Sequence, residues 1–349
     1  YTITNLAGIT IADGSGGTAS NYTLTGGTHN FTVNRRVVGV SGTRLYDATT
    51  NAVASDLSTH TNLVGTETLN LSGTGTIASK NVGSNKTVSV GTLALADGSN
   101  GGLAANYTLS GGTHQLTVNQ RPLNATLSRQ YDGTTTSAGS DLSSFDALQG
   151  GETLTLSGSG TSASANVANG IAMSSNGNLA LVDGTGLASN YSLNSTVINI
   201  TERVLNSSGS KIYDANTDAL AADITLSNLV SGEALNHSGT ATISSANAGS
   251  YTITNLAGIT IADGSGGTAS NYTLTGGTHN FTVNPKVVSI QGNKTYDGNT
   301  TISSGDITSI TDTVGAETLV ISSGSGTVSS ANAATYASAG INEGTLTLG

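Results

Sequence analysis

A tyrosine–aspartate pair recurs four times in the chain, and these residue types could bind a cation or a sugar. A basic residue stands two positions before each tyrosine, so on a strand it would share a face with the ring. Ca²⁺ takes several oxygen ligands, as aspartates supply, and a cation beside an aromatic ring is a common recognition surface. The pairs are Tyr46 and Asp47, Tyr131 and Asp132, Tyr213 and Asp214, and Tyr296 and Asp297, preceded by Arg44, Arg129, Lys211 and Lys294.

A purely structural role explains the same residues, and we favour it. No Asp-x-Asp-x-Asp loop accompanies the pairs. We therefore expect no cofactor, and bound structural Ca²⁺ is the alternative. Each aspartate is predicted to close a turn on its own backbone, and each tyrosine to be a half-buried anchor with its hydroxyl in water. The basic residue is predicted to pair across strands with a carboxylate such as a repeated glutamate. A Lys–Asn isopeptide crosslink is disfavoured, because two of the four basic residues are arginines.

Two further markers recur in a fixed order with these pairs, four times each. A Gly-Glu or Gly-x-Glu element lies about twenty residues downstream, and an Asp-Gly turn then leads to Asn-Tyr. The glutamates are Glu67, Glu152, Glu233 and Glu317. Every Asn-Tyr element is also an Asn-x-Thr/Ser sequon, which makes glycosylation a hypothesis beside the simpler one that the asparagine supports a turn. These asparagines are Asn21, Asn106, Asn190 and Asn271.

Histidines follow Gly-Gly-Thr in three repeats but are missing from the fourth. His29, His114 and His279 have no counterpart near Asn194. A metal or catalytic site would not lose its ligand in one repeat, so we expect these histidines at the surface of a hairpin. No Gly-x-Ser-x-Gly element is present, and the Gly-rich stretches lack the Lys-Ser/Thr of a phosphate loop. We therefore expect neither an enzyme nor any catalytic residue.

Composition excludes several classes of partner. The formal net charge is −10, with 11 Lys and Arg against 21 Asp and Glu, so we expect no nucleic-acid binding, which needs clustered cations. There is no cysteine, which excludes disulfides and thiolate metal sites. No apolar run approaches the length of a membrane helix, so no membrane insertion is expected.

The markers define tandem repeats. The four tyrosines are spaced by 85, 82 and 83 residues, and residues 1–34 are identical to residues 251–284. We infer the C-terminal part of a repeat at 1–34, whole repeats at 35–119, 120–200 and 201–284, and a truncated repeat at 285–349. Tyr1 opens in mid-repeat, so we expect an internal segment of a longer protein.

Local patterns predict an all-β fold. Tyr22 and Leu24 alternate, as do Phe31 and Val33, and the two glycines between these runs predict a β-hairpin. Helix is limited to a turn or two within 51–57 and 218–224. We expect tandem small antiparallel β domains, either immunoglobulin-like sandwiches or β-grasp-like units, strung into a rod. A continuous β-solenoid is the alternative, but its coils would repeat every 20–30 residues.

The ordered markers resemble the YDG repeat of large bacterial exoproteins. The matching elements begin at Lys294, Gly315, Asn81 and Asn271, and the resemblance covers essentially the whole chain. Two repeats carry alanine where the family has glycine after Tyr-Asp. The resemblance implies secretion to the bacterial cell surface, often by the two-partner route of filamentous-haemagglutinin-like proteins.

On that resemblance, we expect a structural stalk or filament segment of an adhesin or biofilm-matrix protein. Its partners would be the neighbouring repeats of the same chain, other chains of the same kind in a filament, and extracellular polysaccharide. The alternative is a multivalent array of weak glycan sites. An exposed ring at Tyr46 and its counterparts would favour that alternative, whereas a buried ring would disfavour it.

Overall fold

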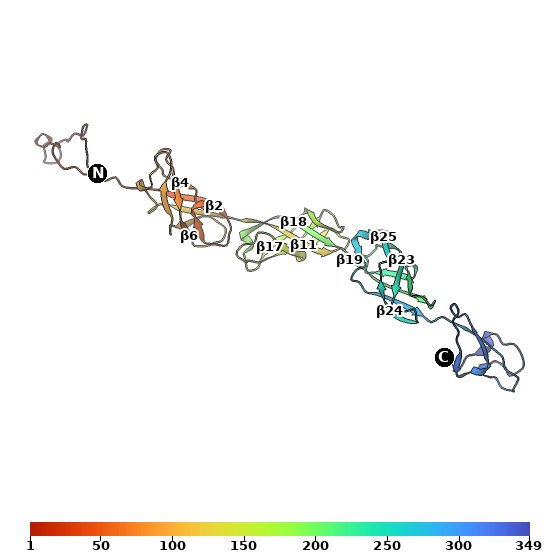
Figure 1. The fold of residues 1–349 in the computed structure, drawn as a ribbon. Coiled ribbons are helices and arrows are strands. Elements are labelled where there is room, and N and C mark those ends of the chain that lie inside the picture. Colours follow the sequence, from red (N-terminus) through yellow and green to blue (C-terminus); the bar gives the residue numbers. More distant parts are fainter. The chain divides into compact units, whose positions relative to one another are not determined.

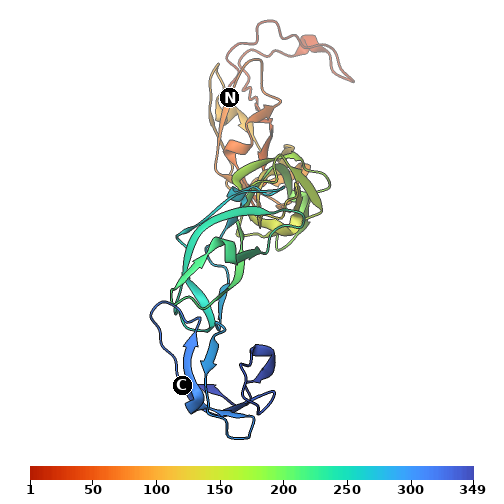
Figure 2. The same ribbon diagram turned by 90° about the vertical axis from the view of Figure 1, so that its right-hand side faces the viewer.

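A computed structural model describes all of residues 1–349 (Figures 1 and 2). Strands dominate, and each helical segment is a three-residue 3₁₀ turn, so the all-β prediction is confirmed. The chain divides into two compact units. The first comprises residues 1–128, 136–163 and 172–198, and the second comprises residues 129–135, 164–171 and 199–349. None of the helical segments has the length and hydropathy that a membrane-spanning helix needs.

The repeat at 35–119 is built around a six-stranded sheet in the order β3-β6-β7-β10-β2-β4, with two small two-stranded sheets beside it. Its main strands are β2 (Gly39–Leu45), β3 (Asn51–Val53), β4 (Thr59–Thr61), β6 (Thr74–Ile77), β7 (Gly83–Ser89) and β10 (His114–Asn119). The small sheets pair β1 (Arg36–Val37) with β9 (Tyr107–Thr108) and β5 (Leu69–Ser72) with β8 (Ala94–Asp97). The 3₁₀ turns here and in the preceding segment are η1 (Ala19–Asn21), η2 (Ala54–Asp56) and η3 (Ala104–Asn106).

The next two repeats reuse this order. The sheets run β12-β15-β16-β18-β11-β13 and β21-β23-β24-β27-β20-β22. The second repeat has β11 (Arg121–Gln130), β12 (Thr136–Ala138), η4 (Gly139–Asp141), β13 (Leu142–Phe145), β14 (Leu154–Ser157), β15 (Ser159–Ser162), β16 (Ala168–Ser175), β17 (Ala180–Asp183), η5 (Ala188–Asn190) and β18 (Tyr191–Thr201). The third has β19 (Arg203–Val204), β20 (Asn206–Ile212), β21 (Asp218–Leu220), η6 (Ala221–Asp223), β22 (Ile224–Ser227), β23 (Leu235–Ile243), β24 (Gly249–Asn255), β25 (Ile259–Asp263), η7 (Ala269–Asn271), β26 (Tyr272–Thr273) and β27 (His279–Asn284).

Residues 285–349 form smaller sheets, namely β28-β30, β29-β32-β33 and β31-β34. Their elements are β28 (Ser289–Gly292), β29 (Thr301–Ser303), η8 (Ser304–Asp306), β30 (Ile307–Thr311), β31 (Ile321–Ser323), β32 (Ser325–Val328), η9 (Ser338–Gly340), β33 (Ile341–Asn342) and β34 (Thr347–Leu348).

The pairing of the first and last long strands departs from the expected antiparallel sheets. β2 and β10 are parallel neighbours, and so are β20 and β27. The predicted hairpin is also wrong. Residues 22–24 and 31–33 belong to no strand, and in the next repeat the equivalent strands do not pair with each other: β9 is a parallel partner of β1, whereas β10 pairs with β2 and β7. Because the first and last strands run in the same direction, the chain enters a repeat at one end and leaves it at the other.

Alternation along the strands builds a thin core. In β10 the side chains of His114, Leu116 and Val118 are buried and their neighbours are not, which is the period of two that a half-buried strand requires. The sheet also needs bare backbone where a 3₁₀ turn packs on it. A Cβ on Gly42 would lie 1.7 Å from the carbonyl oxygen of Asp56 in η2, so glycine is required there.

The segments predicted to form a helical turn or two hold a short strand and one 3₁₀ turn each. These are β3 with η2 and β21 with η6. The alanines of both segments favour helix, so the extended backbone there comes from strand pairing, of β3 with β6 and of β21 with β23.

Candidate functional site: the tyrosine–glutamate junction

Each Tyr-Asp pair lies in a tight turn, and the aspartate closes that turn as predicted. Asp47 Oδ1 accepts a hydrogen bond from the backbone amide of Thr49 at 2.9 Å, and the other three aspartates accept the same bond from the residue two positions on. The residue after aspartate has positive φ in all four turns, +63° and +64° at Ala48 and Ala215 and +78° at the two glycines. Glycine adopts this backbone without strain, and alanine occupies it at a cost.

The basic residue before each tyrosine binds the aspartate of its own turn. The prediction that this residue pairs with a carboxylate is confirmed, but the partner is the nearby aspartate and not a carboxylate across strands such as the repeated glutamate. Lys211 Nζ lies 2.8 Å from Asp214 Oδ1, and it also donates to the carbonyl oxygens of Asn216 and Asp218. The bonds from Lys294 and from the Asn299 backbone lower the pKa of Asp297. The four ion pairs are Arg44–Asp47, Arg129–Asp132, Lys211–Asp214 and Lys294–Asp297.

The tyrosine of this turn reaches into the following repeat, where its hydroxyl meets the repeated glutamate. Tyr46 donates to Glu152 Oε1 at 2.6 Å, and Tyr191 donates to Glu152 Oε2 at 2.8 Å. The two rings pack edge to face with centroids 5.3 Å apart, a favoured aromatic geometry. One carboxylate thus joins the Tyr-Asp tyrosine of one repeat to the Asn-Tyr tyrosine of the next, and we call this arrangement the tyrosine–glutamate junction.

The second junction repeats this geometry. Tyr131 and Tyr272 each donate to Glu233 at 2.6 Å, and their ring centroids are 5.4 Å apart. Glu152 has an additional partner, because Lys80 donates to it at 2.6 Å and lies over the Tyr46 ring. Burial alone would raise the pKa of Glu152, but the bonds from Lys80 and the two tyrosines outweigh it and lower that pKa.

The asparagine of each Asn-Tyr element adds a second link between repeats. Asn190 is 1% exposed. It accepts from the backbone amide of Val82 at 2.9 Å and donates to Asn81 Oδ1 at 3.0 Å. Asn271 makes the same two bonds to Val167 and Asn166. A sugar on either amide nitrogen would break this link, whereas Asn21 and Asn106 are exposed and glycosylation there stays a prediction.

The histidines are not the surface residues that the sequence suggested. His114 and His279 are 5% and 7% exposed, and each ring nitrogen Nε2 bonds the backbone carbonyl five residues before it. Each histidine closes the Gly-Gly turn of its repeat from the inside. The second repeat has neither the two glycines nor the histidine at this place, so the fold does not require this bond in every repeat. No group of three or more His, Asp or Glu side chains converges as a metal site would require.

The buried phenols predict a response to alkaline pH. Burial and the bond to Glu233 raise the pKa of Tyr131 to about 12. Burial raises the pKa of Tyr191 to about 12. The hydrogen bond to Glu152 adds to this rise, and the bond from the Gln149 backbone amide opposes it. A phenol whose pKa is higher in the folded state stabilises the fold fully below its unfolded pKa of about 10, and this stabilisation is lost as the pH rises through about 12.

We therefore expect the tyrosinate absorbance of the 11 tyrosines to rise in two phases. Tyr131 and Tyr191 would ionise in the later phase, near pH 12, with a parallel fall in the free energy of unfolding. Ionisation of every tyrosine in one early step, with the fold intact, would contradict the junction geometry.

Comparison with known families agrees with the repeat markers. A family model described as the YDG domain matches residues 32–116, 113–198 and 200–280. No protein with curated annotation matches the chain significantly.

Proposed function

Since this chain belongs to the YDG-domain family, we propose that it is a stalk segment of a secreted bacterial adhesin or biofilm-matrix protein, giving reach and mechanical persistence. The observation that carries the proposal is the tyrosine–glutamate junction, in which one buried carboxylate binds a tyrosine from each of two successive repeats. A stalk must resist bending at its joints, and bonds that cross each joint supply that resistance.

Two features of the backbone support the same role. β2 and β10 are parallel, so a repeat spans the distance between its entry and exit, roughly 20 Å for a six-residue strand at about 3.3 Å per residue. Asn119 ends β10 and Arg121 begins β11, so a single residue connects two successive repeats. A joint this short leaves little freedom for one repeat to move against the next.

The hydrophobic core also continues across the first junction. Leu123, Leu154 and Tyr191 of the second repeat belong to the same buried cluster as Val38 and Leu116 of the first. Repeats that share a core stabilise their neighbours, as in other repeat arrays.

The glycan-array interpretation draws little support from the repeated tyrosines. Tyr46 and Tyr131 are 0% and 5% exposed, so neither ring offers a free face on which a sugar could stack. Of the four, Tyr296 alone is largely exposed, at 67%, and one such ring makes no multivalent array. The stalk is therefore the function that we propose.

Distances between spin labels test the stalk directly. The chain has no cysteine, so cysteines can be introduced in pairs at Thr76, Thr161 and Thr242. These are equivalent positions in successive repeats, each paired with the first residue of β3, β12 or β21. We expect narrow distance distributions for Thr76–Thr161 and Thr161–Thr242, and a Thr76–Thr242 distance close to their sum. Broad distributions, or an outer distance much shorter than the sum, would contradict a stalk.

A further inference from the structure

Two pairs of tyrosine rings are in contact in this chain, and each pair joins two successive repeats. Tyr46 packs against Tyr191 with ring centroids 5.3 Å apart, and Tyr131 packs against Tyr272 with centroids 5.4 Å apart. In each pair one ring belongs to a Tyr-Asp turn and the other to the Asn-Tyr element of the next repeat. A bond between the two rings would therefore cross the joint between repeats.

The two rings of a pair converge at their hydroxyl ends. At the first joint the hydroxyls donate to the two oxygens of Glu152, at 2.6 and 2.8 Å, and at the second both donate to Glu233 at 2.6 Å. Because one carboxylate holds both hydroxyls, the ring carbons beside them are also drawn together. These carbons carry much of the unpaired electron of a tyrosyl radical, and two such radicals join through them.

The shared carboxylate supplies what the oxidation of a phenol requires. A phenol that loses an electron becomes a strong acid, so the electron leaves most easily when a base already accepts the phenol's hydrogen bond. The distances from the two hydroxyls to Glu152 lie within the roughly 2.6–3.2 Å over which a proton passes directly. Each junction thus pairs two oxidisable rings with one proton acceptor.

The composition directs one-electron oxidation to tyrosine. The chain has no cysteine, no tryptophan and a single methionine, against 11 tyrosines. An electron taken from an exposed tyrosine can be replaced by one from a buried ring. Tyr46 is 0% exposed, but its ring lies just below the surface, because Lys80 covers it at 5.8 Å from the centroid and the lysine side chain is 41% exposed. Electron transfer can reach the ring without direct contact with an oxidant.

We propose that the two junctions are sites of oxidative crosslinking, where a dityrosine bond joins Tyr46 to Tyr191 and Tyr131 to Tyr272. The proposal rests on the geometry of the junctions and not on the stalk function. Each bond locks one joint between repeats covalently. By closing a long loop of chain, it also restricts the unfolded state and so stabilises the folded one.

The reaction is a two-electron oxidation, and its oxidant is hydrogen peroxide consumed by a haem peroxidase. Each phenol gives up one electron, and its proton passes to the carboxylate and from there to water. The two radicals form a carbon–carbon bond between the positions next to their oxygens. The hydrogens on these two carbons then move to the oxygens and restore both phenols. The pair has lost two electrons and two protons, which convert one hydrogen peroxide into two waters.

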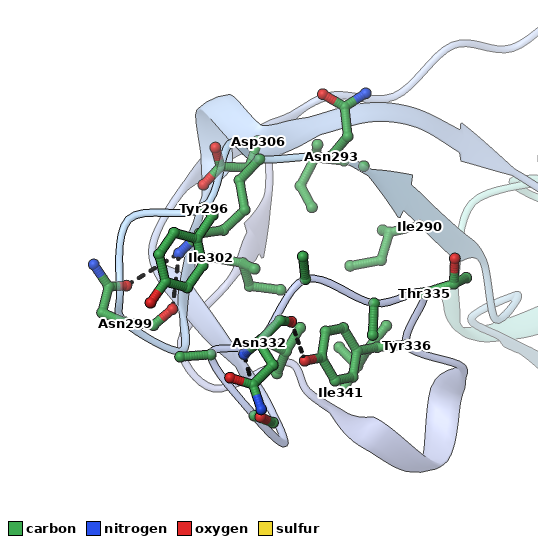
Figure 3. A pocket seen from close by; sticks show the side chains of 18 residues that line it. Ile290, Asn293, Tyr296, Asn299, Ile302, Asp306, Asn332, Thr335, Tyr336 and Ile341 are labelled. Atoms are coloured by element: carbon green, nitrogen blue, oxygen red, sulfur yellow. Dashed lines mark hydrogen bonds between the residues drawn. The ribbon is translucent and has the colours of Figure 1, made fainter.

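The tyrosines of residues 285–349 lack this arrangement (Figure 3). Tyr296 and Tyr336 line a pocket of about 390 Å³, and Figure 3 shows them on different sides of it. Tyr336 donates to the backbone carbonyl of Asn332 at 2.6 Å rather than to a carboxylate, and neither ring packs on a second one. These tyrosines are therefore an internal comparison for the paired ones.

Peptide mapping tests the proposal. The full chain is treated at low concentration with a haem peroxidase and hydrogen peroxide, and the monomeric fraction is digested with trypsin. The peptides 45–80, 130–203 and 212–286 carry Tyr46, Tyr191 with Tyr131, and Tyr272. We expect the middle peptide to be linked to each of the others, every link lowering the summed mass by two hydrogens. The same treatment in urea, which opens the junctions, should give no preferred pair. Unlinked peptides from the folded monomer, or the same pairs at equal yield in urea, would overturn the proposal.

Dityrosine fluorescence of the monomer counts the bonds. Tyr46→Phe keeps a ring at the first joint but forms no phenoxyl radical, so it should halve the emission. The double variant Tyr46→Phe, Tyr131→Phe should abolish it. Tyr296→Phe is the matched control, because it removes an unpaired tyrosine and should leave the monomer's emission unchanged. Undiminished emission from the double variant would place the bonds elsewhere and contradict the proposal.

The carboxylate's part as proton acceptor is tested at one joint, with the other joint as the internal control. Glu152→Gln keeps both rings and removes the charge, so the first link should form at least several-fold more slowly. The second link should form at the parent rate, because its tyrosines bind Glu233. Parent rates at both joints would contradict proton transfer to the shared carboxylate.

Discussion

Replacing Glu152 by alanine is expected to lower the free energy of unfolding of the first two repeats by about 3–5 kcal/mol, because it leaves two buried tyrosine hydroxyls without their acceptor, each at a cost of about 1–3 kcal/mol. The carboxylate is 7% exposed and accepts from Tyr46, Tyr191 and Lys80. Without it, two phenol hydroxyls lose their acceptors and the Lys80 ammonium loses its counter-charge. Urea unfolding followed by tyrosine fluorescence measures the loss without interference, since the chain has no tryptophan.

Two variants calibrate this experiment. Glu152→Gln keeps the size and one acceptor oxygen, so about 1–2 kcal/mol should be lost for the weaker bonds. Glu343→Ala removes an exposed carboxylate and should leave the unfolding curve unchanged. If Glu152→Ala behaved like Glu343→Ala, the junction would contribute nothing to coupling and the stalk proposal would lose its main support.

Local chemistry made part of the fold predictable. The aspartate turns follow from the residues themselves, because an aspartate can bond the backbone two positions on in any context. The period of about 83 residues and the all-β class likewise depend only on which residues recur. The turns and strands are decided within a few residues of chain, and the period needs only a comparison of the recurring markers.

The junction was not predictable from such local patterns. The contact between Tyr46 and Glu152 joins residues 106 positions apart, and the parallel pairing of β2 with β10 joins strands about 75 positions apart. Opposite charge alone suggested the glutamate as a partner of the basic residue. In the structure the lysine or arginine pairs instead with the aspartate three residues further along the chain. A signal was present, since tyrosine, glutamate and Asn-Tyr recur once per repeat in a fixed order, as residues that meet across a joint would.

The histidines show why burial is hard to infer for polar residues. His114 lies in an alternating strand whose inward positions also hold Leu116 and Val118. Its ring can enter the core because Leu109 supplies a carbonyl acceptor, and that acceptor is created by the turn rather than by the strand pattern. A polar residue at an inward position of a strand is thus a candidate for a turn-closing bond.

The tyrosines themselves allow the sharpest comparison, since the chain holds the same motif in a buried and an exposed state. Tyr46 is 0% exposed and Tyr296 is 67% exposed, although both precede an aspartate that closes the same turn. Tyr46→Ala should cost about 3–5 kcal/mol, as truncation of a buried aromatic ring does, whereas Tyr296→Ala should change the unfolding free energy little.

Tyr46→Phe separates the ring from the hydroxyl. It keeps the edge-to-face packing with Tyr191 and loses the bond to Glu152, so about 1–2 kcal/mol should be lost. Differential scanning calorimetry of the four proteins gives the ranking, with Tyr46→Ala least stable, then Tyr46→Phe, then Tyr296→Ala beside the parent chain. Equal destabilisation by Tyr46→Ala and Tyr296→Ala would mean that the motif stabilises its own turn and not the joint with the next repeat.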